Sequence, residues 1–371
     1  MRYANKLALV TAVAAAIGIM ATAQAAVGPS TTIGIYTEAD MLSPLTGNNT
    51  TPSNWRVTSG MTFNGTNFDG VARLRFDNDG SLTNGAYICS GTLLSGGLYV
   101  LTAAHCADDF NVMELAFGVY GGVAAETRSV AQAFVHPGWS GSLSRGNDIA
   151  IIQLNAPVTT IQGFNISTSN DVGQEFLIMG HGTTGVGNST AAPNWGEYGW
   201  MHWGRNKADA TVVQFLNAAQ AQGIPSLGTW SNADGEEYVS DYDGVGNPTR
   251  HNTLGRITGL VSNTGLGADE ALIAGGDSGG GDFVWNGSQW LVSGVHSWGW
   301  QFCGGRLTTP DSCDFSTGNS SSWGDVSGST AVFSHAEWIA TVTGVPEPGT
   351  YAMMLAGLGV VGALARRRKA V

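Results

Sequence analysis

Short apolar runs separated by turns rich in Gly, Asn and Ser dominate the chain after residue 70. Runs of four to nine residues bounded in this way are typical of β-strands. The pattern predicts strands at 71–76, 86–94, 98–102, 128–135, 148–154, 175–179, 211–215, 281–285, 290–296 and 330–333. We therefore expect an all-β body.

Helical and irregular segments are fewer. Ser334 precedes 335–340, which predicts a Ser-capped terminal helix. The stretch from 180 to 252 is rich in Gly, Asn and Trp with weak periodicity, and predicts long loops with a helical piece near 212–222. Residues 26–56 show no clear period and are expected to be a pro-segment or linker.

Composition narrows the class of protein. Of 371 residues, 54 are Gly, roughly twice the usual share, and only 12% are charged. A hydrophobic fraction of 43% excludes a disordered chain, and the low charge excludes a long coiled coil. The net charge of −12 argues against a nucleic-acid partner, because phosphate binding needs a basic face. Composition favours a secreted, mostly β protein.

The first 25 residues have the three parts of a signal peptide. Arg2 and Lys6 form a basic start, 7–20 is an apolar run, and Ala23-Gln24-Ala25 is a small-residue cleavage site. The alternative, a membrane anchor, is disfavoured because the run is too short for a bilayer of about 30 Å. We predict export, with 1–25 removed.

The other end contains Val345-Pro346-Glu347-Pro348-Gly349, an apolar stretch at 351–365 and Arg366-Arg367-Arg368-Lys369. These features resemble the PEP-CTERM sorting tail of Gram-negative bacteria. The resemblance implies that 345–371 is a tail that rests transiently in the inner membrane and is cut by an exosortase-type sorting enzyme. The body would then be secreted or attached to the cell envelope; a plain tail anchor is the alternative.

Removing these ends makes the body more acidic. Residues 1–25 carry two basic side chains, 349–371 carry four, and neither segment has an acid, so the net charge falls from −12 to −18. Such a body suits solubility outside the cell and makes a nucleic-acid partner still less plausible. The membrane is expected to be met only through the tail.

Three motifs carry candidate chemistry. His105 ends the run Leu101-Thr102-Ala103-Ala104-His105, Asp148 opens an apolar strand, and Ser278 lies in Gly275-Gly276-Asp277-Ser278-Gly279-Gly280. Nucleophilic acyl transfer needs these three groups: a hydroxyl, an imidazole that takes its proton, and a carboxylate that orients the imidazole. The spacings are 43 and 130 residues.

With these motifs in the order His, Asp, Ser, the chain resembles the trypsin-like (chymotrypsin-fold) serine proteases over residues 57–344. The resemblance implies two packed antiparallel β-barrels with a short C-terminal helix, and a serine endopeptidase that acts on proteins or peptides. His105 would be general base and then acid, Asp148 its orienting partner and Ser278 the nucleophile. A monomer without cofactor or metal is expected.

The resemblance also assigns supporting residues. The N–H groups of Gly276 and Ser278 would form the oxyanion hole, and glycine at 276 allows a backbone conformation that a Cβ would hinder. Four cysteines allow three pairings. The family pattern implies that Cys89 pairs with Cys106, leaving Cys303 and Cys313 to close a surface loop.

Activation is predicted by position. In this family a freed N-terminal amine pairs with the Asp before the nucleophile, here Asp277. Arg56-Val57 lies at the corresponding position before the strand at 71–76, so cleavage after Arg56 would free Val57. The protein would then be made as a zymogen.

The resemblance also predicts which residue the enzyme prefers before the scissile bond. Ser297-Trp298-Gly299 resembles the strand that pairs with the substrate backbone, and Leu272 stands at the floor of the primary pocket. An apolar floor disfavours Arg or Lys, whose charge would be buried unpaired. Because Ala274 replaces the family's pocket cysteine, a shifted register is the alternative, and it would bring Glu270 or Asp269 to the pocket and restore a basic preference.

Weaker patterns give no metal site, and two rival functions are compatible with the motifs. Asp241-Tyr242-Asp243-Gly244 with Asn247 faintly resembles a calcium loop but lacks its distal Glu, so an ordinary acidic turn is expected. His181, His202 and His296 have no metal-ligand spacing and are expected to be loop or packing residues. The rival functions are a catalytically inactive surface binding protein on the protease scaffold, and an esterase that uses the same triad.

Overall fold

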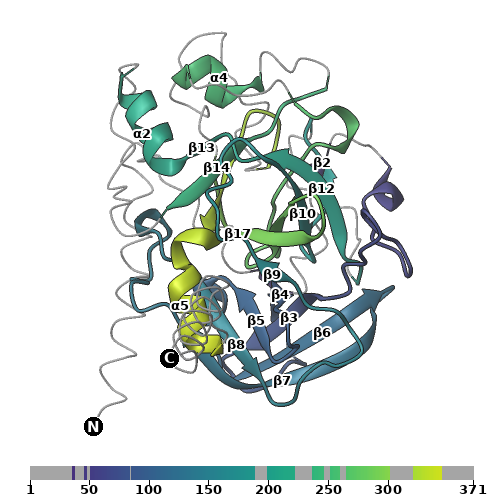
Figure 1. The fold of residues 1–371 in the computed structure, drawn as a ribbon. Helices are drawn as coiled ribbons and strands as arrows, with labels where there is room; N and C mark the ends of the chain where they lie inside the picture. Colours follow the sequence, from purple (N-terminus) through teal and green to yellow (C-terminus); the bar gives the residue numbers. More distant parts are fainter. Residues whose placement is uncertain are drawn as a thin grey trace, which may run out of the picture.

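A computed structural model describes most of the predicted body. Apart from the backbone of 36–37 and 46–47, it covers residues 51–83, 85–188, 199–221, 236–245, 251–259, 265–300 and 321–344. Two curled antiparallel β-sheets make up most of this part, one below the other in Figure 1, with a short helix at its end. The predicted signal peptide, the tail from 345, and Cys303 and Cys313 lie outside the described residues.

The first sheet closes into a barrel, because β5 pairs with β8 on one side and with β4 on the other. Its order is β4-β3-β6-β7-β8-β5, and β1 pairs with β4. The strands are β1 Tyr36–Thr37, β3 Val71–Asp77, β4 Tyr87–Leu93, β5 Tyr99–Thr102, β6 Val112–Tyr120, β7 Val123–Val135 and β8 Ala150–Leu154.

The second sheet has the order β12-β10-β16-β17-β18-β14-β13, with β9 paired in parallel to β17. The Asn206 amide on β12 bridges toward β14, because it donates to Asp241 O at 2.9 Å. The strands are β9 Asn165–Ile166, β10 Glu175–Gly180, β12 His202–Lys207, β13 Ala210–Thr211, β14 Glu237–Asp241, β16 Gly281–Trp285, β17 Trp290–Trp300 and β18 Val326–Ala331.

The remaining elements are short. A small sheet joins β11-β2-β15. Its strands and the helices are β2 Thr46–Gly47, β11 Gly185–Val186, β15 Ala271–Leu272, the α-helices α2 Val212–Ala221, α4 Thr253–Thr258 and α5 Ala336–Thr343, and the 3₁₀ helices η4 Pro52–Asn54, η5 Ala104–Cys106, η6 Leu143–Arg145, η7 Gly267–Asp269 and η8 Val332–His335.

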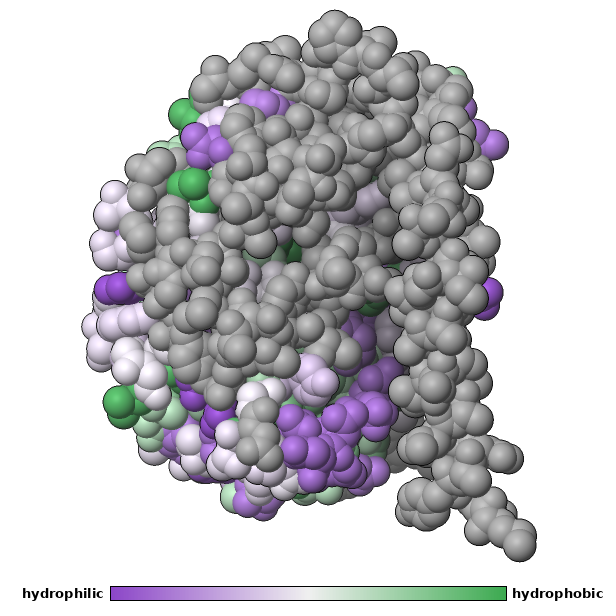
Figure 2. Space-filling model, turned by 180° about the vertical axis from the view of Figure 1, so that it is seen from behind, coloured by the Kyte–Doolittle hydropathy of each residue, from purple (hydrophilic) through white to green (hydrophobic). Residues whose placement is uncertain are grey.

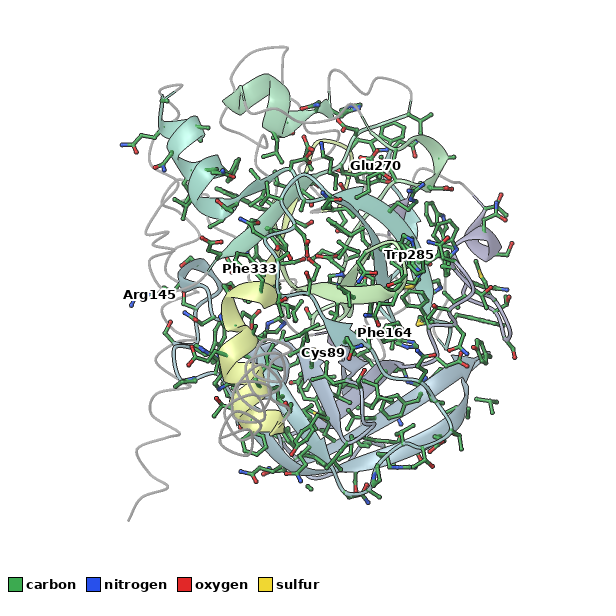
Figure 3. All side chains as sticks on the ribbon, in the orientation of Figure 1. Cys89, Arg145, Phe164, Glu270, Trp285 and Phe333 are labelled. Carbon is green, nitrogen blue, oxygen red and sulfur yellow. A yellow bond between two sulfur atoms is a disulfide. The ribbon has the colours of Figure 1, made fainter. Side chains whose placement is uncertain are left out.

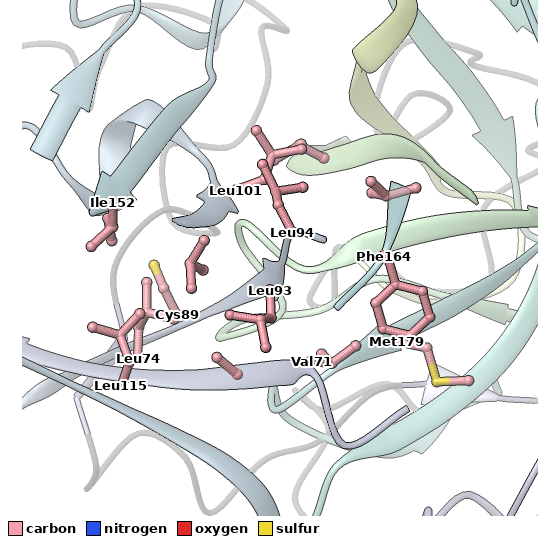
Figure 4. Packing of buried hydrophobic residues seen from close by; sticks show 14 of the residues in the cluster. Val71, Leu74, Cys89, Leu93, Leu94, Leu101, Leu115, Ile152, Phe164 and Met179 are labelled. Atoms are coloured by element: carbon pink, nitrogen blue, oxygen red, sulfur yellow. The ribbon is translucent and has the colours of Figure 1, made fainter. Parts of the chain in front are cut away.

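A continuous apolar core joins the two barrels (Figure 4). Val71 and Leu74 of β3 belong to the same buried cluster as Met179 of β10. Phe68 and Phe283 meet edge to face with their ring centroids 4.9 Å apart. Each fully buried side chain of this size stabilises the fold by about 1.5–3 kcal/mol, so the core holds the two barrels against each other.

The predicted all-β class with two packed antiparallel barrels and a short C-terminal helix is confirmed by this topology. The predicted strand at 211–215 is wrong, because β13 ends at Thr211 and α2 begins at Val212. Gln214 N donates to Thr211 Oγ1 at 3.2 Å, and Thr211 N donates to Gln214 Oε1 at 2.9 Å. This reciprocal capping box stabilises a helix start, which agrees with the helix predicted near 212–222.

The terminal helix forms, but Ser334 does not cap it. The Ser334 hydroxyl donates instead to Ala331 O at 2.7 Å inside η8, and α5 begins at Ala336 after His335. For the same reason the predicted strand at 330–333 is displaced: β18 ends at Ala331, where the chain turns into η8.

Among the described strands of five or more residues, β6, β12 and β14 have no counterpart among the predictions. In β12 the buried positions are His202, Gly204 and Asn206, so the inward face is not apolar. In β14 every residue is buried, including Glu237 and Asp241 at its two ends. In β12 and β14, inward-facing polar residues interrupt the hydrophobic alternation by which a strand is predicted from sequence.

Few large hydrophobic side chains are exposed on the described part of the chain. Among the described residues, the exposed large hydrophobic side chains are Val123, Val213, Val245 and Trp285, which lie apart in the sequence. On the face in Figure 2, green residues form small separate spots, and purple hydrophilic residues gather toward the bottom. No helix within the described part has the length and apolar character needed to cross a bilayer.

Candidate active site

His105 lies in η5, directly after β5. β5 pairs with β4, which carries Cys89, and a disulfide joins Cys89 to Cys106. The predicted pairing of these two cysteines is therefore confirmed. In Figure 3, Cys89 is labelled where the two barrels meet. Because Cys106 follows His105 directly, its disulfide to Cys89 fixes the His105 turn to β4.

Asp148 lies just before β8 and is completely buried. Its Oδ2 lies 2.7 Å from His105 Nδ1 and accepts from Ser297 Oγ at 2.6 Å, while its Oδ1 accepts from His105 N at 2.9 Å. Its backbone carbonyl accepts from Thr330 Oγ1 at 3.0 Å. These four contacts come from both barrels, so the carboxylate has one orientation.

The carboxylate sets the tautomer of His105. A carboxylate only accepts hydrogen bonds, so His105 Nδ1 carries the proton that it donates to Asp148. In the neutral ring, Nε2 then has the lone pair. This is the arrangement that a general base for a hydroxyl requires.

The Ser278 turn is hydrogen-bonded to β4, the strand that carries Cys89. Ser90 of β4 donates through its N–H to Ser278 O at 2.7 Å and through its hydroxyl to Gly276 O at 3.0 Å. Cys106 Sγ lies 3.6 Å from Ser278 O. The structure therefore brings the Ser278 backbone next to the residue that follows His105.

Glycine at 276 has the backbone conformation expected of it. Its φ is +88°, in the region where a side chain is strained and glycine is favoured. Gly279 also has a positive φ, +79°, and a Cβ there would lie 2.4 Å from Ser90 O and 2.9 Å from Ala103 N. The turn around Ser278 therefore depends on glycine for both its shape and its close packing against the first barrel.

A buried carboxyl near Asp148 was not found from the sequence. Glu237, the first residue of β14, lies opposite Thr330, and burial raises its pKa to about 8 with a further contribution from the charge of Asp148; a hydrogen bond with Trp298 acts the other way. Glu237 therefore keeps its proton near neutral pH. The available signal was an acid at the start of the short apolar run Tyr238-Val239.

Asp277 is held by neighbouring backbone groups. Its carboxylate accepts from Gly182 N at 2.8 Å and from Ala274 N at 3.1 Å, and burial raises its pKa to about 6. Val57 is buried too, but its N–H donates to Met201 O at 2.8 Å. These contacts belong to a chain in which the Arg56–Val57 bond is intact, so the activation pair stays a prediction.

The predicted specificity residues are all buried. Ser297, Trp298 and Gly299 lie on β17, with a bulge in its pairing to β18 between His296 and Trp298. Leu272 lies on β15, which pairs with β2.

Glu270, the alternative pocket residue, has its carboxylate engaged within the chain. It accepts from Leu266 N at 2.6 Å and Asp243 N at 2.7 Å, and burial raises its pKa to about 8. Figure 3 labels it at the top of the second sheet, away from Cys89. The other alternative, Asp269, is partly exposed at the end of η7.

The acidic turn after β14 is buried with Glu270 nearby. Burial raises the pKa of Asp243 to about 10, with additional contributions from the charges of Asp241 and Glu270. Within the described ranges, three potential metal ligands come within 4.8 Å of one another at Cys89, His105 and Cys106. That group does not suit a metal, because both sulfurs are in the disulfide and are not thiolates.

Comparisons with known proteins agree with the motifs. Residues 59–209 match the trypsin family, and residues 344–369 match the PEP-CTERM protein-sorting motif. A solved structure titled "HL collagenase structure at 1.7 Å resolution" is similar over 79% of this chain and 98% of its own, with 17% identity and a TM-score of 0.49.

The match to the trypsin family thus covers the part of the chain that includes His105 and Asp148, and the match to the PEP-CTERM sorting motif covers 344–369. Both predicted resemblances are confirmed, and together they support an exported serine protease. Ser278 lies beyond the matched range.

Proposed function

We propose that this protein is an exported serine endopeptidase that uses Ser278, His105 and Asp148. The observation that carries the proposal is the 2.7 Å contact between His105 Nδ1 and a buried Asp148 carboxylate, in a histidine turn packed against the Ser278 backbone. This arrangement supports acyl transfer, because a proton held on Nδ1 gives Nε2 the lone pair that can take a hydroxyl proton.

In the proposed reaction, Ser278 Oγ attacks the carbonyl carbon of the scissile peptide while His105 Nε2 takes its proton. The N–H groups of Gly276 and Ser278 stabilise the charge on the carbonyl oxygen. His105 then gives the proton to the leaving amine as the C–N bond breaks, which leaves an acyl-enzyme. Water attacks this ester, again with His105 as base, and Ser278 regains its proton as the acid product leaves.

The proposed preference before the scissile bond is for a non-basic, apolar residue. Leu272 is buried, and both oxygens of Glu270 accept from backbone groups of the chain itself, which supports the register that places Leu272 at the pocket floor. A peptide library assay tests this preference. Cleavage after Arg or Lys in most products would reverse it.

The proposed organisation keeps the layout predicted from the sequence: a signal peptide at 1–25, a pro-segment at 26–56, the protease domain at 57–344 and the sorting tail at 345–371. Cleavage after Arg56 would free Val57 to reach Asp277. N-terminal sequencing of the active form tests that step, and a start well away from Val57 would contradict it.

The test of the proposed function compares peptide and ester turnover by the wild type and by Ser278→Ala. A protease cleaves internal peptide bonds and loses this activity in the variant. Turnover of simple esters without peptide cleavage would favour the esterase, and no turnover of either would favour the inactive binding protein.

A further inference from the structure

His296 is a buried histidine that the proposed reaction does not use. It precedes Ser297 on β17 and is completely buried. Its backbone is bonded to the Ser278 turn on both sides: Gly279 N donates to His296 O at 2.8 Å, and His296 N donates to Gly280 O at 2.9 Å. The ring therefore lies directly behind the nucleophile turn.

Both ring nitrogens of His296 face hydrogen-bond acceptors. Nε2 lies 2.9 Å from Asp282 Oδ1, and Nδ1 lies 3.0 Å from the backbone carbonyl oxygen of Asp277. Neither oxygen carries a hydrogen, so both contacts are satisfied only when both nitrogens are protonated. The geometry therefore favours an imidazolium at His296, with the Asp282 carboxylate as its counter-charge.

The surrounding charges favour this state. Burial alone would lower the pKa of His296, but the charge and hydrogen bond of Asp282 and the charge of Asp277 outweigh it and raise the pKa. From β18 the residue opposite His296 is Ser329, which is uncharged. The charged groups that face the ring are thus Asp277 and Asp282.

The Asp277 carbonyl belongs to the same peptide unit as the Ser278 N–H. The described chain has no cis peptide bonds, so this carbonyl and this N–H point in opposite directions from one plane. Gly280 N also donates to this oxygen at 2.8 Å, so His296 and Gly280 together fix the oxygen on one side and thereby the N–H on the other. A cation on the oxygen also polarises the peptide and strengthens the N–H as a donor.

The packing leaves no freedom around this contact. A Cβ on Gly280 would lie 2.8 Å from His296 Nδ1 and 2.5 Å from Met179 O, and one on Gly294 would lie 2.5 Å from Asp282 Oδ2. Position 280 therefore requires glycine, and a side chain at 294 would displace the Asp282 carboxylate. The backbone of two strands encloses the ring and its partners closely, so the ring has one position.

We propose that His296 is a positioning residue for the oxyanion hole: its imidazolium, held by Asp282, binds the Asp277 carbonyl and so orients the Ser278 N–H toward the substrate oxygen. The inference rests on the proposed protease function, and it gives His296 a role beyond the loop or packing role expected from the sequence. The contacts of His296 with Asp282 and with the Asp277 carbonyl are present in the chain with the Arg56–Val57 bond intact, so they do not need a freed N-terminal amine.

The test uses His296→Gln and Asp282→Asn in the full-length chain, with kcat and KM measured separately on a peptide substrate. The oxyanion hole acts in the transition state, so kcat is expected to fall about 10²-fold in His296→Gln, while KM changes less than about threefold. The matched control is His202→Gln, because His202 is also completely buried but lies on β12. Its kcat is expected to stay within about threefold of wild type.

Asp282→Asn keeps the shape but removes the charge that favours the imidazolium. The alkaline limb of its kcat profile is expected to move to lower pH by about one to two units. A purely structural role would lower stability without moving this limb. The inference would be overturned if His296→Gln kept the kcat of the wild type, or if the alkaline limb of the kcat profile did not move in a folded Asp282→Asn. Either result would leave the proposed protease function intact. An inactive wild type would contradict both the inference and the proposed function.

Discussion

Replacing Asp148 by Asn separates the geometry of the triad from its charge. In the first of two orientations, the amide nitrogen takes the place of Oδ2 and points at His105 Nδ1 and Ser297 Oγ, both of which can accept. His105 then carries its proton on Nε2 and cannot take one from Ser278. In the second, the amide nitrogen opposes the His105 backbone N–H, now 2.9 Å from Oδ1.

The second orientation keeps the useful tautomer but places two donors against each other in a buried site. An unsatisfied buried donor costs about 1–3 kcal/mol, so roughly one molecule in six to one in 160 would hold the useful tautomer. Those molecules have also lost the negative charge that stabilises the imidazolium. Together these effects give an expected fall in kcat of about 10⁴-fold, or about 5.4 kcal/mol.

The assay is kcat on a peptide substrate for wild type, Asp148→Asn and the control Asp171→Asn. Asp171 is also buried and accepts from a serine hydroxyl, Ser293 Oγ at 2.6 Å, on the same strand as Ser297. The control is expected to keep kcat within about threefold. A kcat for a folded Asp148→Asn within tenfold of wild type would refute the assigned roles of His105 and Asp148.

Three further substitutions give smaller, distinct effects. Ser297→Ala removes the 2.6 Å bond to Asp148 and is expected to lower kcat/KM about threefold to tenfold; an unchanged kcat/KM and melting temperature would contradict this. Glu237 has a native pKa of about 8, above its ordinary 4.5, so its contribution to the free energy of unfolding is full below about pH 4.5 and is lost as pH rises to about 8. Glu237→Gln should therefore flatten the fall in stability by up to about 1.4 kcal/mol per pH unit in urea titrations, and an unchanged slope would count against a buried, protonated Glu237. Replacing Cys89 and Cys106 by Ala removes a cross-link between residues 17 apart and should cost about 3 kcal/mol of unfolding free energy, whereas a loss under about 0.5 kcal/mol would show that the cross-link contributes little.

The sequence identifies the elements of the site that are locally encoded. His105, Asp148 and Ser278 each lie in a short motif at the end of a strand or in a glycine turn, and such motifs are readable without knowing the fold. The strands around them are equally local, since β3 and β16 begin where their apolar runs begin.

What the sequence does not predict depends on contacts between distant segments. β12 and β14 turn polar side chains inward, so their apolar alternation is missing. Glu237 is significant only because the fold buries it near Asp148, 89 residues earlier in the chain. His296 and Asp282 are 14 residues apart, and only the pairing of β16 with β17 shows that they meet.

Two local signals conflict at 211–215. Thr211 and Gln214 have the spacing of a capping box, which predicts a helix start, while the β-branched run Thr211-Val212-Val213 favours a strand. The helix forms because Val212, Phe215 and Ala219 bury one face against the second barrel. Helical spacing of the buried residues therefore outweighed local β-propensity.

Labelling by a serine-directed phosphonate tests the nucleophile most directly. The exported chain is treated with the reagent, and the modified peptide is identified by mass spectrometry in wild type and in Ser278→Ala. A single adduct on Ser278 in the wild type, absent from Ser278→Ala, is the expected result. No adduct on the folded wild type, or labelling unaffected by the substitution, would contradict a serine protease that acts through Ser278.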